Sequence, residues 1–265
     1  MRPVSCWPSS WSTSCFSHGW IAMSVVGNAK RLSLSLHAKH WPDGRQVLGA
    51  MNFSLAVGEV LAISGPSGCG KSTLLSIVAG LDQAFDGRLE WSGGQPPGLG
   101  IVFQTPRLLP WRTVLANVSL GLADGAKNTS PARQALAEVG LSEAADVYPA
   151  RLSLGMARRV AFARALLSEP DLLLLDEAFA SLDDEAAGKL RASVMTRVAN
   201  RRMSVLMVTH DLRDAEEMAD RLLVLGGTPA RVVDERAMPT RTSAPTLTST
   251  AVPTDRSFAR GSCPP

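Results

Sequence analysis

A glycine-rich stretch, "ISGPSGCGKSTLLSIVAG" at residues 63–80, limits the possible folds of this 265-residue chain more than any other feature. Its segment "GPSGCGKS" at 65–72 matches the pattern G-x-x-x-x-G-K-[ST], between a strand-like and a helix-like apolar run. The glycines can adopt positive φ, so successive backbone N–H groups can point into one concavity. The following helix adds the positive end of its dipole. The pattern therefore predicts a phosphate-binding loop that joins a strand to a helix.

Two side chains of this loop have separate expected roles. Lys71 can reach the β- and γ-phosphates of a nucleotide, and the Ser72 hydroxyl can ligate Mg²⁺. A glycine-rich turn without a ligand is the alternative for the loop alone. The residues expected to contact the nucleotide here are Gly65, Pro66, Ser67, Gly68, Cys69, Gly70, Lys71, Ser72 and Thr73.

An apolar run that ends in two acidic residues supplies the carboxylate that such a loop needs. The run is "LLLLDE" at 172–177. A buried parallel strand brings its C-terminal residue to the sheet edge where ligands bind. We expect Asp176 to hold the metal through water and Glu177 to polarise the water that attacks the γ-phosphate. The alternative is an exposed acidic pair that closes a strand.

Three further residues fit the same site. Gln104 ends the run "LGIVFQ", and His210 ends the run "MSVLMVTH". Trp41 precedes the loop at a distance where an aromatic ring could stack on a purine. Taken singly, residues such as Gln104 and His210 are more often capping or solvated loop residues, and Trp41 is one of six tryptophans.

Strand-like and helix-like runs alternate through the middle of the chain. The middle three strand-like runs are almost continuously apolar, as in strands covered on both faces. This alternation predicts an α/β domain with a mostly parallel sheet. Residues from about 106 to 158 contain no convincing strand and are expected to form a helical insertion. The expected strands are 59–64, 99–104, 171–176, 203–210 and 221–226, and the expected helices are 71–79, 131–139, 155–168, 183–199 and 212–219.

We expect one ordered domain over residues 29–236. Residues 1–28 are rich in Trp, Ser and Cys, show no periodicity and lack the apolar core of a signal peptide. They are expected to be disordered or mis-started, with Met23 as the biological start. Residues 237–265 are rich in Pro, Thr and Ser, which is typical of a flexible tail.

Composition excludes several classes of function. The net charge is only +3 and no Lys/Arg block is present, so nucleic-acid binding is not expected. No apolar run approaches the roughly 20 residues that span a bilayer, so action at a membrane would require a partner. The four cysteines form no CxxC pair and no even framework, which indicates a reducing compartment and argues against zinc.

The ordered set of motifs resembles the nucleotide-binding subunit of an ATP-binding cassette (ABC) transporter over about residues 30–235. The resemblance implies a P-loop NTPase (RecA-like) core, an N-terminal antiparallel β part and a helical subdomain at about 106–158. It implies ATP and Mg²⁺ as cofactors. The motifs that carry it are Trp41, "GPSGCGKST", Gln104, "RLSLGMARRVAFARAL" at 151–166, "LLLLDEAFASLD" at 172–183 and "VTHD" at 208–211.

The resemblance also assigns roles to single residues. Gln104 corresponds to the Q-loop residue, which takes part in catalysis and in metal binding. His210 corresponds to the switch histidine, a catalytic residue. Residues 181–183, from Ser181 to Asp183, belong to the D-loop, with Asp183 at the nucleotide, and Trp41 corresponds to the aromatic that stacks on adenine.

The segment "LSLGM" at 152–156 lies where the family carries its signature LSGGQ. Ser153 and the Gly155 N–H would bind the γ-phosphate of ATP held by a second subunit, in a head-to-tail dimer that we expect to be a homodimer. Leu154 and Met156 depart from the signature, and Ala178 replaces the proline that usually follows the catalytic Glu.

The segments "VFQTPRLLPWRTVLANVSLGL" at 102–122 and "YPARLSLGM" at 148–156 resemble importer subunits of the nitrate/sulfonate/taurine type. The implied partners are transmembrane permease subunits and, indirectly, a solute-binding protein. The implied location is peripheral, on the cytoplasmic face of the inner membrane. Leu109, Trp111 and Val114 are candidate permease contacts, and the alternative is that they form the core of the helical subdomain.

Three functions compete. The first is a transport ATPase. The second is a regulatory or degenerate cassette that binds ATP with little turnover beside an active partner, a reading motivated by Leu154 and Ala178. The third is a soluble ABC ATPase of DNA repair or translation, which would carry a long coiled-coil insertion or two cassettes. This chain has neither feature.

Overall fold

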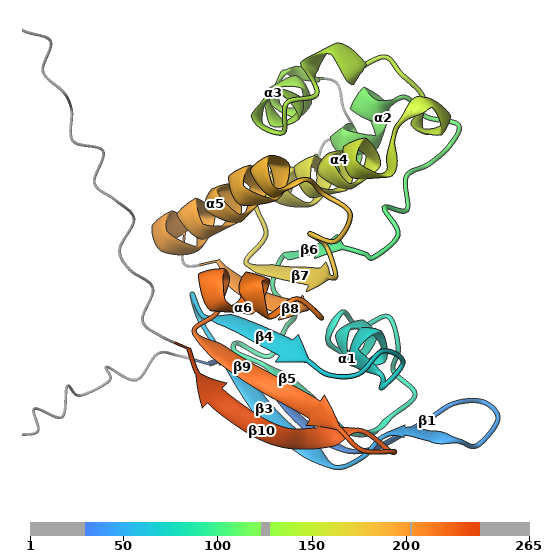
Figure 1. Ribbon diagram of the computed structural model, residues 1–265, viewed down its shortest axis with the longest axis vertical. Helices are drawn as coiled ribbons and strands as arrows, with labels where there is room; N and C mark the ends of the chain where they lie inside the picture. Colours follow the sequence, from blue (N-terminus) through green and yellow to red (C-terminus); the bar gives the residue numbers. More distant parts are fainter. Residues whose placement is uncertain (1–29, 123–127, 202, 239–265) are drawn as a thin grey trace, which may run out of the picture.

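The computed structural model of the chain describes residues 30–122, 128–201 and 203–238. The expectations for residues 1–28, for Met23 and for nearly all of 237–265 lie outside the described residues. Figure 1 shows two β-sheets and a group of helices in layers, with helices at one end and antiparallel strands at the other. No helix in the described part of the chain combines the length and apolar character needed to cross a membrane.

A six-stranded, mostly parallel sheet forms the centre of the fold. Its strands are β4 (Val60–Ser64), β6 (Leu99–Val102), β7 (Leu172–Asp176), β8 (Ser204–Val208), β9 (Arg221–Gly226) and β10 (Arg231–Ala237). Their order is β10-β9-β4-β8-β7-β6, and the edge strand β10 is antiparallel to β9. The sequence patterns do not predict β10, which includes Ala237, the first residue of the expected tail.

The parallel strands are buried on both faces, and this explains their almost continuous apolar sequences. All five residues of β7 are buried. Leu173 and Leu175 belong to one hydrophobic cluster, whereas Leu172 and Leu174 belong to another. Successive side chains of a strand point to opposite faces. Each face of the sheet therefore carries its own core.

An antiparallel sheet covers one face together with α1 (Lys71–Val78). Its strands are β1 (Lys30–His40), β2 (Gln46–Leu48), β3 (Met51–Ala56) and β5 (Asp86–Trp91), and β1 pairs with the other three. The β5 strand follows the phosphate-binding loop, so this β part is not wholly N-terminal. Sequence reasoning misses β5 because its residues are mostly exposed and show little apolar alternation.

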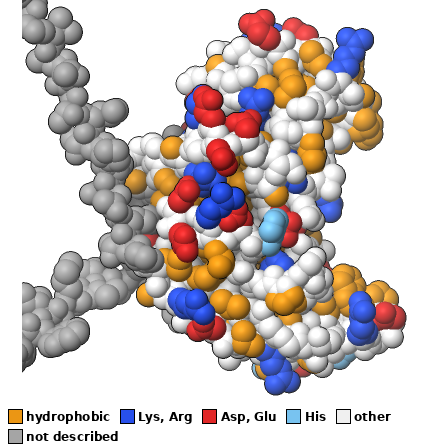
Figure 2. Space-filling view, viewed as in Figure 1, with side chains coloured by type: hydrophobic (Ala, Val, Ile, Leu, Met, Phe, Trp, Pro, Cys, Tyr) orange, Lys and Arg blue, Asp and Glu red, His pale blue; other side chains and the backbone are white. Residues whose placement is uncertain are grey.

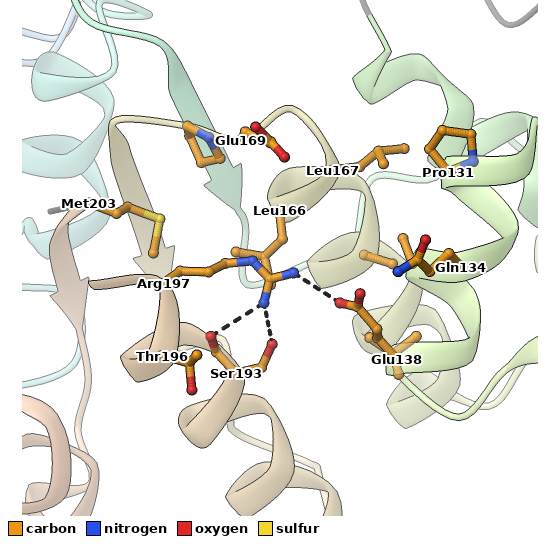
Figure 3. Close-up of a pocket in the computed structure, with 14 residues that line it drawn as sticks. Pro131, Gln134, Glu138, Leu166, Leu167, Glu169, Ser193, Thr196, Arg197 and Met203 are labelled. Carbon is orange, nitrogen blue, oxygen red and sulfur yellow. Dashed lines mark hydrogen bonds and ion pairs between the residues drawn. The ribbon is translucent and has the colours of Figure 1, made fainter. Parts of the chain in front are cut away.

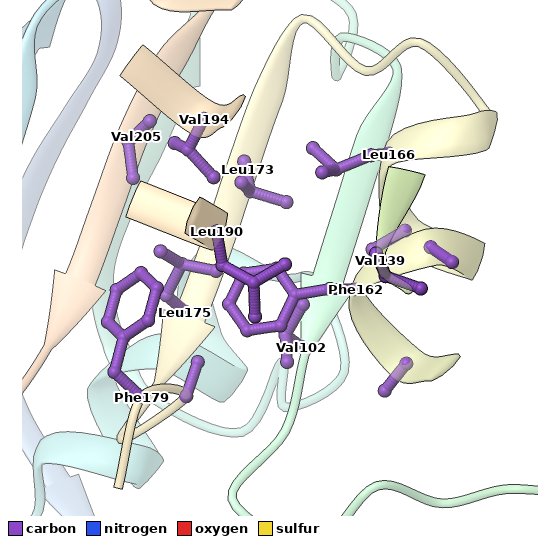
Figure 4. Close-up of a cluster of buried hydrophobic side chains, with 14 of the residues drawn as sticks. Val102, Val139, Phe162, Leu166, Leu173, Leu175, Phe179, Leu190, Val194 and Val205 are labelled. Atoms are coloured by element: carbon purple, nitrogen blue, oxygen red, sulfur yellow. The ribbon is translucent and has the colours of Figure 1, made fainter. Parts of the chain in front are cut away.

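Helices cover the other face of the parallel sheet. They are α2 (Val114–Val118), α3 (Ser130–Glu138), α4 (Leu154–Leu167), α5 (Asp184–Arg201) and α6 (Leu212–Met218), with short 3₁₀ turns at Ser119–Gly121, Ser142–Ala144 and Pro149–Arg151. In the described part of 106–158 there is no strand. Figure 4 shows Phe162 of α4 pointing toward Leu175 and Val102 of the sheet. Its ring centroid lies 5.3 Å from that of Phe179.

Arg197 of α5 joins the core to the smaller helices. Its Nη2 donates to Glu138 Oε2 of α3 at 2.9 Å, and its Nη1 donates to Ser193 Oγ at 2.6 Å. Figure 3 shows these contacts in a cavity of about 370 Å³ between α3, α4 and α5. Because the Arg197 guanidinium bonds to Ser193 of α5 and to Glu138 of α3, it holds these two helices against each other.

Of the three candidate permease contacts, Val114 is fully buried in the cluster under the helices. The prediction that Val114 contacts the permease is therefore wrong, because its side chain packs inside the core. Trp111 is 71% exposed. Leu109 is half-buried, and its backbone N–H and C=O both bond to the buried side chain of Asn117. Asn117 thus fixes the loop that presents Trp111.

We predict that Phe162→Ala lowers the free energy of unfolding by about 3–5 kcal/mol, because it leaves a cavity in the middle of the core. Urea titration followed by circular dichroism measures the change. The matched control is Val233→Ala on β10, where the side chain is 63% exposed. That variant should stay within about 0.5 kcal/mol of the unmodified chain. Equal effects of the two substitutions would contradict this assignment of the core.

Candidate active site

The loop between β4 and α1 depends on glycine at its last position. Gly70 has φ of 106°, a conformation that residues with a Cβ rarely adopt. A Cβ at Gly70 would also lie 2.7 Å from Leu48 Cδ2 and 3.0 Å from Val47 Cγ2. Strand β2 therefore packs directly on the backbone of the loop, and this contact holds the start of α1 in place.

Lys71 lies folded over the same loop. Its side chain is buried, and its Nζ donates to the carbonyl oxygens of Gly65 and Pro66, both at 2.8 Å. A lysine ammonium has three donors. Two of them hold the lysine against the loop, and the third can bind a phosphate oxygen.

Ser72 and Asp176, two of the expected metal ligands, meet at the end of the parallel sheet. Ser72 Oγ donates to Asp176 Oδ1 at 3.1 Å. Burial raises the pKa of the Asp176 carboxyl, and the Ser72 hydrogen bond and the nearby Lys71 charge oppose that rise. Oxygen ligands of this kind fit Mg²⁺, which proteins usually bind through one or two carboxylates together with phosphate oxygens and water.

Two of the three expected catalytic residues converge on a carboxylate oxygen of the third, Glu177. Gln104 Nε2 donates to Glu177 Oε2 at 2.9 Å, and His210 Nδ1 lies 3.5 Å from the same oxygen. They follow the ends of β6, β7 and β8, which are neighbours in the sheet. The Gln104 amide oxygen is not used in this bond, so it is available to a metal.

The backbone of Glu177 turns sharply after β7. Its φ is +45°, in the left-handed region that is uncommon for a residue with a side chain. Its N–H donates to Val208 O at 2.9 Å, which ties the turn to β8. Because of this turn, the side chain of Asp176 meets Ser72, whereas the side chain of Glu177 meets Gln104 and His210.

The signature segment forms the start of α4. The Ser153 side chain accepts a hydrogen bond from the Met156 N–H at 3.2 Å and so caps the helix. A Cβ at Gly155 would lie 3.5 Å from Ser181 O, so the signature rests against the D-loop. Asp183 caps α5, where its Oδ1 accepts from Ala186 N at 2.8 Å. The start of α4 presents N–H groups suited to an anion.

Trp41 lies in the turn between β1 and β2 and is 39% exposed. The turn closes through Gly44 N donating to Trp41 O at 2.9 Å. The three-residue strand β2 follows this turn and packs on Gly70, so it links the turn to the phosphate-binding loop. An exposed ring on this side meets the requirement for stacking on a base.

Arg158 is a site residue that lies within the quoted motif at 151–166 but to which the sequence assigns no role. Its Nη1 donates to Glu177 O at 3.2 Å, and its Nη2 donates to Gln104 O at 3.1 Å. It precedes Phe162 by one helical turn and is buried on the same apolar face of α4. A charged residue at an apolar position of a helical pattern is the signal that could have identified it.

Comparison with known proteins identifies the family. Residues 48–180 match the family model described as ABC transporter. The chain belongs to the ABC transporter family. The aliphatic sulfonates import ATP-binding protein SsuB 1 of Pseudomonas aeruginosa (strain UCBPP-PA14) is 45% identical over 212 residues, which are 76% of this chain and 84% of that protein. SsuB 3 of Nocardia farcinica (strain IFM 10152) is 50% identical over 182 residues, 69% of this chain and 72% of that protein.

Solved structures agree with this assignment. The ATP-binding cassette MJ0796, in a dimeric post-hydrolysis state bound to ADP and Pi, superposes with a TM-score of 0.71 at 28% identity, covering 78% of this chain and 99% of that one. The cbiO1 protein from Clostridium perfringens, part of the ABC transporter complex cbiONQ, gives a TM-score of 0.65 at 27% identity, covering 79% of this chain and 89% of that one. The expected P-loop NTPase fold and ATPase activity are confirmed, and the roles of single residues stay predictions.

We predict that Gly70→Ala weakens ATP binding by at least about tenfold, because the added methyl group is strained by φ and collides with Leu48. Titration with a fluorescent ATP analogue measures the affinity. Gly80→Ala is the matched control, since Gly80 has φ of 71° and nothing within 4 Å of an added Cβ. The control should bind the analogue as the unmodified chain does. Equal affinities for all three proteins would show that β2 does not shape the loop.

Proposed function

We propose that this chain is the ATP-hydrolysing subunit of an importer for aliphatic sulfonates, within the nitrate/sulfonate/taurine type. Relatives that are 45% and 50% identical are aliphatic sulfonates import ATP-binding proteins, which supports both the direction and the class of cargo. The chain would act from the cytoplasmic face of the inner membrane, attached to permease subunits. A solute-binding protein would deliver the cargo to that permease.

The observation that carries this proposal is the convergence of Gln104 and His210 on Glu177, beside the pair Ser72 and Asp176. The loop and Lys71 bind the triphosphate. Glu177 accepts a hydrogen bond from the attacking water and takes its proton as the water oxygen attacks the γ-phosphorus and ADP leaves.

The positions of Gln104 and His210 keep the Glu177 carboxylate in one orientation while it acts. Ser72, Asp176 and Gln104 are the residues that would hold Mg²⁺, which neutralises charge on the β- and γ-phosphate oxygens when it is bound. The second ring nitrogen of His210 can donate a hydrogen bond to the γ-phosphate. His210 would then link the bound phosphate to Glu177.

A second copy of the chain completes the site in this proposal. Ser153 and the first N–H groups of α4 would bind the γ-phosphate held by the partner's loop. The dimeric structure of the similar cassette MJ0796 supports a two-fold arrangement. Leu154 is 52% exposed, so it points outward at that seam without disturbing the helix cap.

Nothing in the described site favours the degenerate cassette. Ala178 is a buried residue of the turn after β7, and the adjacent Glu177 lies within reach of both Gln104 and His210. Neither Leu154 nor Ala178 removes a group that binds phosphate, metal or water.

Trp111 and Tyr148 form the permease-docking face in this proposal. They are 71% and 51% exposed, and two backbone bonds between residues 114–115 and 145–147 hold their segments side by side. Figure 2 shows hydrophobic side chains at the outer edge of the helical part. An exposed pair of large aromatic side chains is typical of a protein interface.

We predict that Glu177→Gln lowers ATP hydrolysis by the assembled transporter at least about 100-fold while ATP binding persists, because the amide cannot take a proton. Lys71→Ala should lose ATP binding itself. Proteoliposomes that contain the assembled transporter, with the solute-binding protein and labelled alkanesulfonate on the side opposite the ATP-binding subunits, measure hydrolysis and uptake together. Equal and negligible hydrolysis by the unmodified and Glu177→Gln complexes would instead favour the degenerate cassette. Hydrolysis without uptake of any alkanesulfonate would reject the cargo class.

We predict that the pair Trp111→Ala and Tyr148→Ala reduces co-purification with the permease by at least about tenfold, because apolar contact area is lost at the interface. Pull-down from detergent-solubilised membranes measures it, and ATP binding by the isolated cassette should be unchanged. Leu81→Ala is the control, since Leu81 is 61% exposed elsewhere on the chain. Undiminished permease recovery with the double variant would place the docking face elsewhere.

A further inference from the structure

Arg158 contacts the two residues at the centre of the site, although the mechanism above does not use it. Its side chain extends inward from α4 and is only 5% exposed. One branch of its guanidinium donates to the Glu177 carbonyl at 3.2 Å and the other to the Gln104 carbonyl at 3.1 Å. The side chains of Glu177 and Gln104 bond to each other at 2.9 Å. A single planar fork therefore holds the backbones of two residues whose side chains meet.

A second arginine of α4 holds the continuation of the same segment. Arg164 donates to Arg107 O at 3.0 Å and to Pro106 O at 3.1 Å. Arg107 has φ of +46°, and its guanidinium lies 4.2 Å from the ring centroid of Phe103. Residues 104–107 are thus bound along their length to one helix. Any displacement of α4 would carry Gln104 with it.

The turn that carries Glu177 is attached to its surroundings through the Glu177 backbone on two sides. The Glu177 N–H donates to Val208 O of β8, and the Glu177 carbonyl accepts from Arg158. The left-handed φ of Glu177 costs energy that surrounding contacts must offset. Phe162 of the same helix packs against Phe179 of this turn, and the Arg158 fork adds a hydrogen bond from α4 to the Glu177 backbone itself.

Packing alone does not account for an arginine at this position. Burial removes the hydration of the guanidinium and lowers the pKa of Arg158, although the Glu177 charge opposes that shift. Within the described residues, Arg158 Nε has no hydrogen-bond partner. An apolar side chain of similar length would fill the space without this cost.

We propose that Arg158 is a positioning residue that couples α4 to hydrolysis, by holding Gln104 and Glu177 in fixed relation to each other and to the helix. The inference rests on the proposed role of Glu177 as the base. Ser153, at the start of the same helix, faces the nucleotide of the second copy in the proposed dimer. The base of each copy is then in place only when its own α4 is seated.

The test is Arg158→Met in the complete transporter, with steady-state ATP hydrolysis and nucleotide affinity measured separately. We expect kcat to fall about tenfold to 100-fold, because the base is misplaced, while the Kd for ATP stays within about twofold. Arg158→Lys should recover part of the rate, since an ammonium can still bond to one of the two carbonyls. In a Gln104→Ala background, Arg158→Met should lower kcat much less than it does alone, because both changes act on one unit.

Arg159→Met is the matched control. Arg159 is the next residue of α4 and also donates to a backbone carbonyl, that of Val139 at 3.1 Å, but none of its hydrogen bonds reaches the site. Its kcat should stay within about twofold of the unmodified protein. A thermal unfolding scan identifies any Arg158→Met protein that fails to fold, and Arg158→Lys then carries the test.

Three results would overturn the inference: an unchanged kcat for Arg158→Met, equal losses for Arg158→Met and Arg159→Met, or fully additive losses with Gln104→Ala. Glu177→Gln, assayed in parallel, separates this failure from a failure of the proposed function. If Glu177→Gln hydrolyses ATP at the normal rate, then Glu177 is not the base. If it does not, and Arg158→Met is active, only the role of Arg158 is rejected.

Discussion

The site depends on the meeting of parallel strand ends at one edge of the central sheet. The loop after β4, the acidic pair at the end of β7, Gln104 after β6 and His210 after β8 reach this edge from strands far apart in the sequence. Burial on both faces fixes the register of these strands, since a slip by one residue would exchange the side chains of the two cores. The same burial that stabilises the sheet therefore brings the hydrogen-bonded groups of the site within reach of one another.

The sequence could predict the parts of this arrangement in which local pattern and tertiary environment agree. The run Leu172–Leu175 has the sequence of a buried strand because both of its sides face apolar cores, and the glycines of the loop mark a backbone that other residues rarely adopt. The strands of the antiparallel sheet carry a weaker local signal. One side of β5 faces solvent and its partner β1 is far away in the sequence, so only the assembled sheet defines it.

Two residues show where pattern reasoning stops. Val114 reads equally well as a surface contact or as core, because an apolar residue in a short helix carries no information about which side is covered; the fold buries it. Arg158 is one of three arginines in α4, and its apolar helical position indicates burial but not what the side chain binds. Its role depends on two carbonyl groups, at Gln104 and Glu177, whose approach to α4 arises only in the folded chain.

The arrangement of α4 suggests how two distant nucleotides could affect each other. Ser153 caps the helix at its outer end, and Arg158 points inward from it five residues later, a rise of about 7.5 Å at 1.5 Å per residue. The intervening turn is hydrogen-bonded helix, which transmits displacement with little loss, and Arg164 attaches its later part to residues 106–107. In the proposed dimer, a phosphate that draws in the Ser153 end would also move the Arg158 fork. Because the fork holds the proposed base of its own copy, occupancy of one nucleotide site would then change the geometry of the other without any direct contact between the two triphosphates.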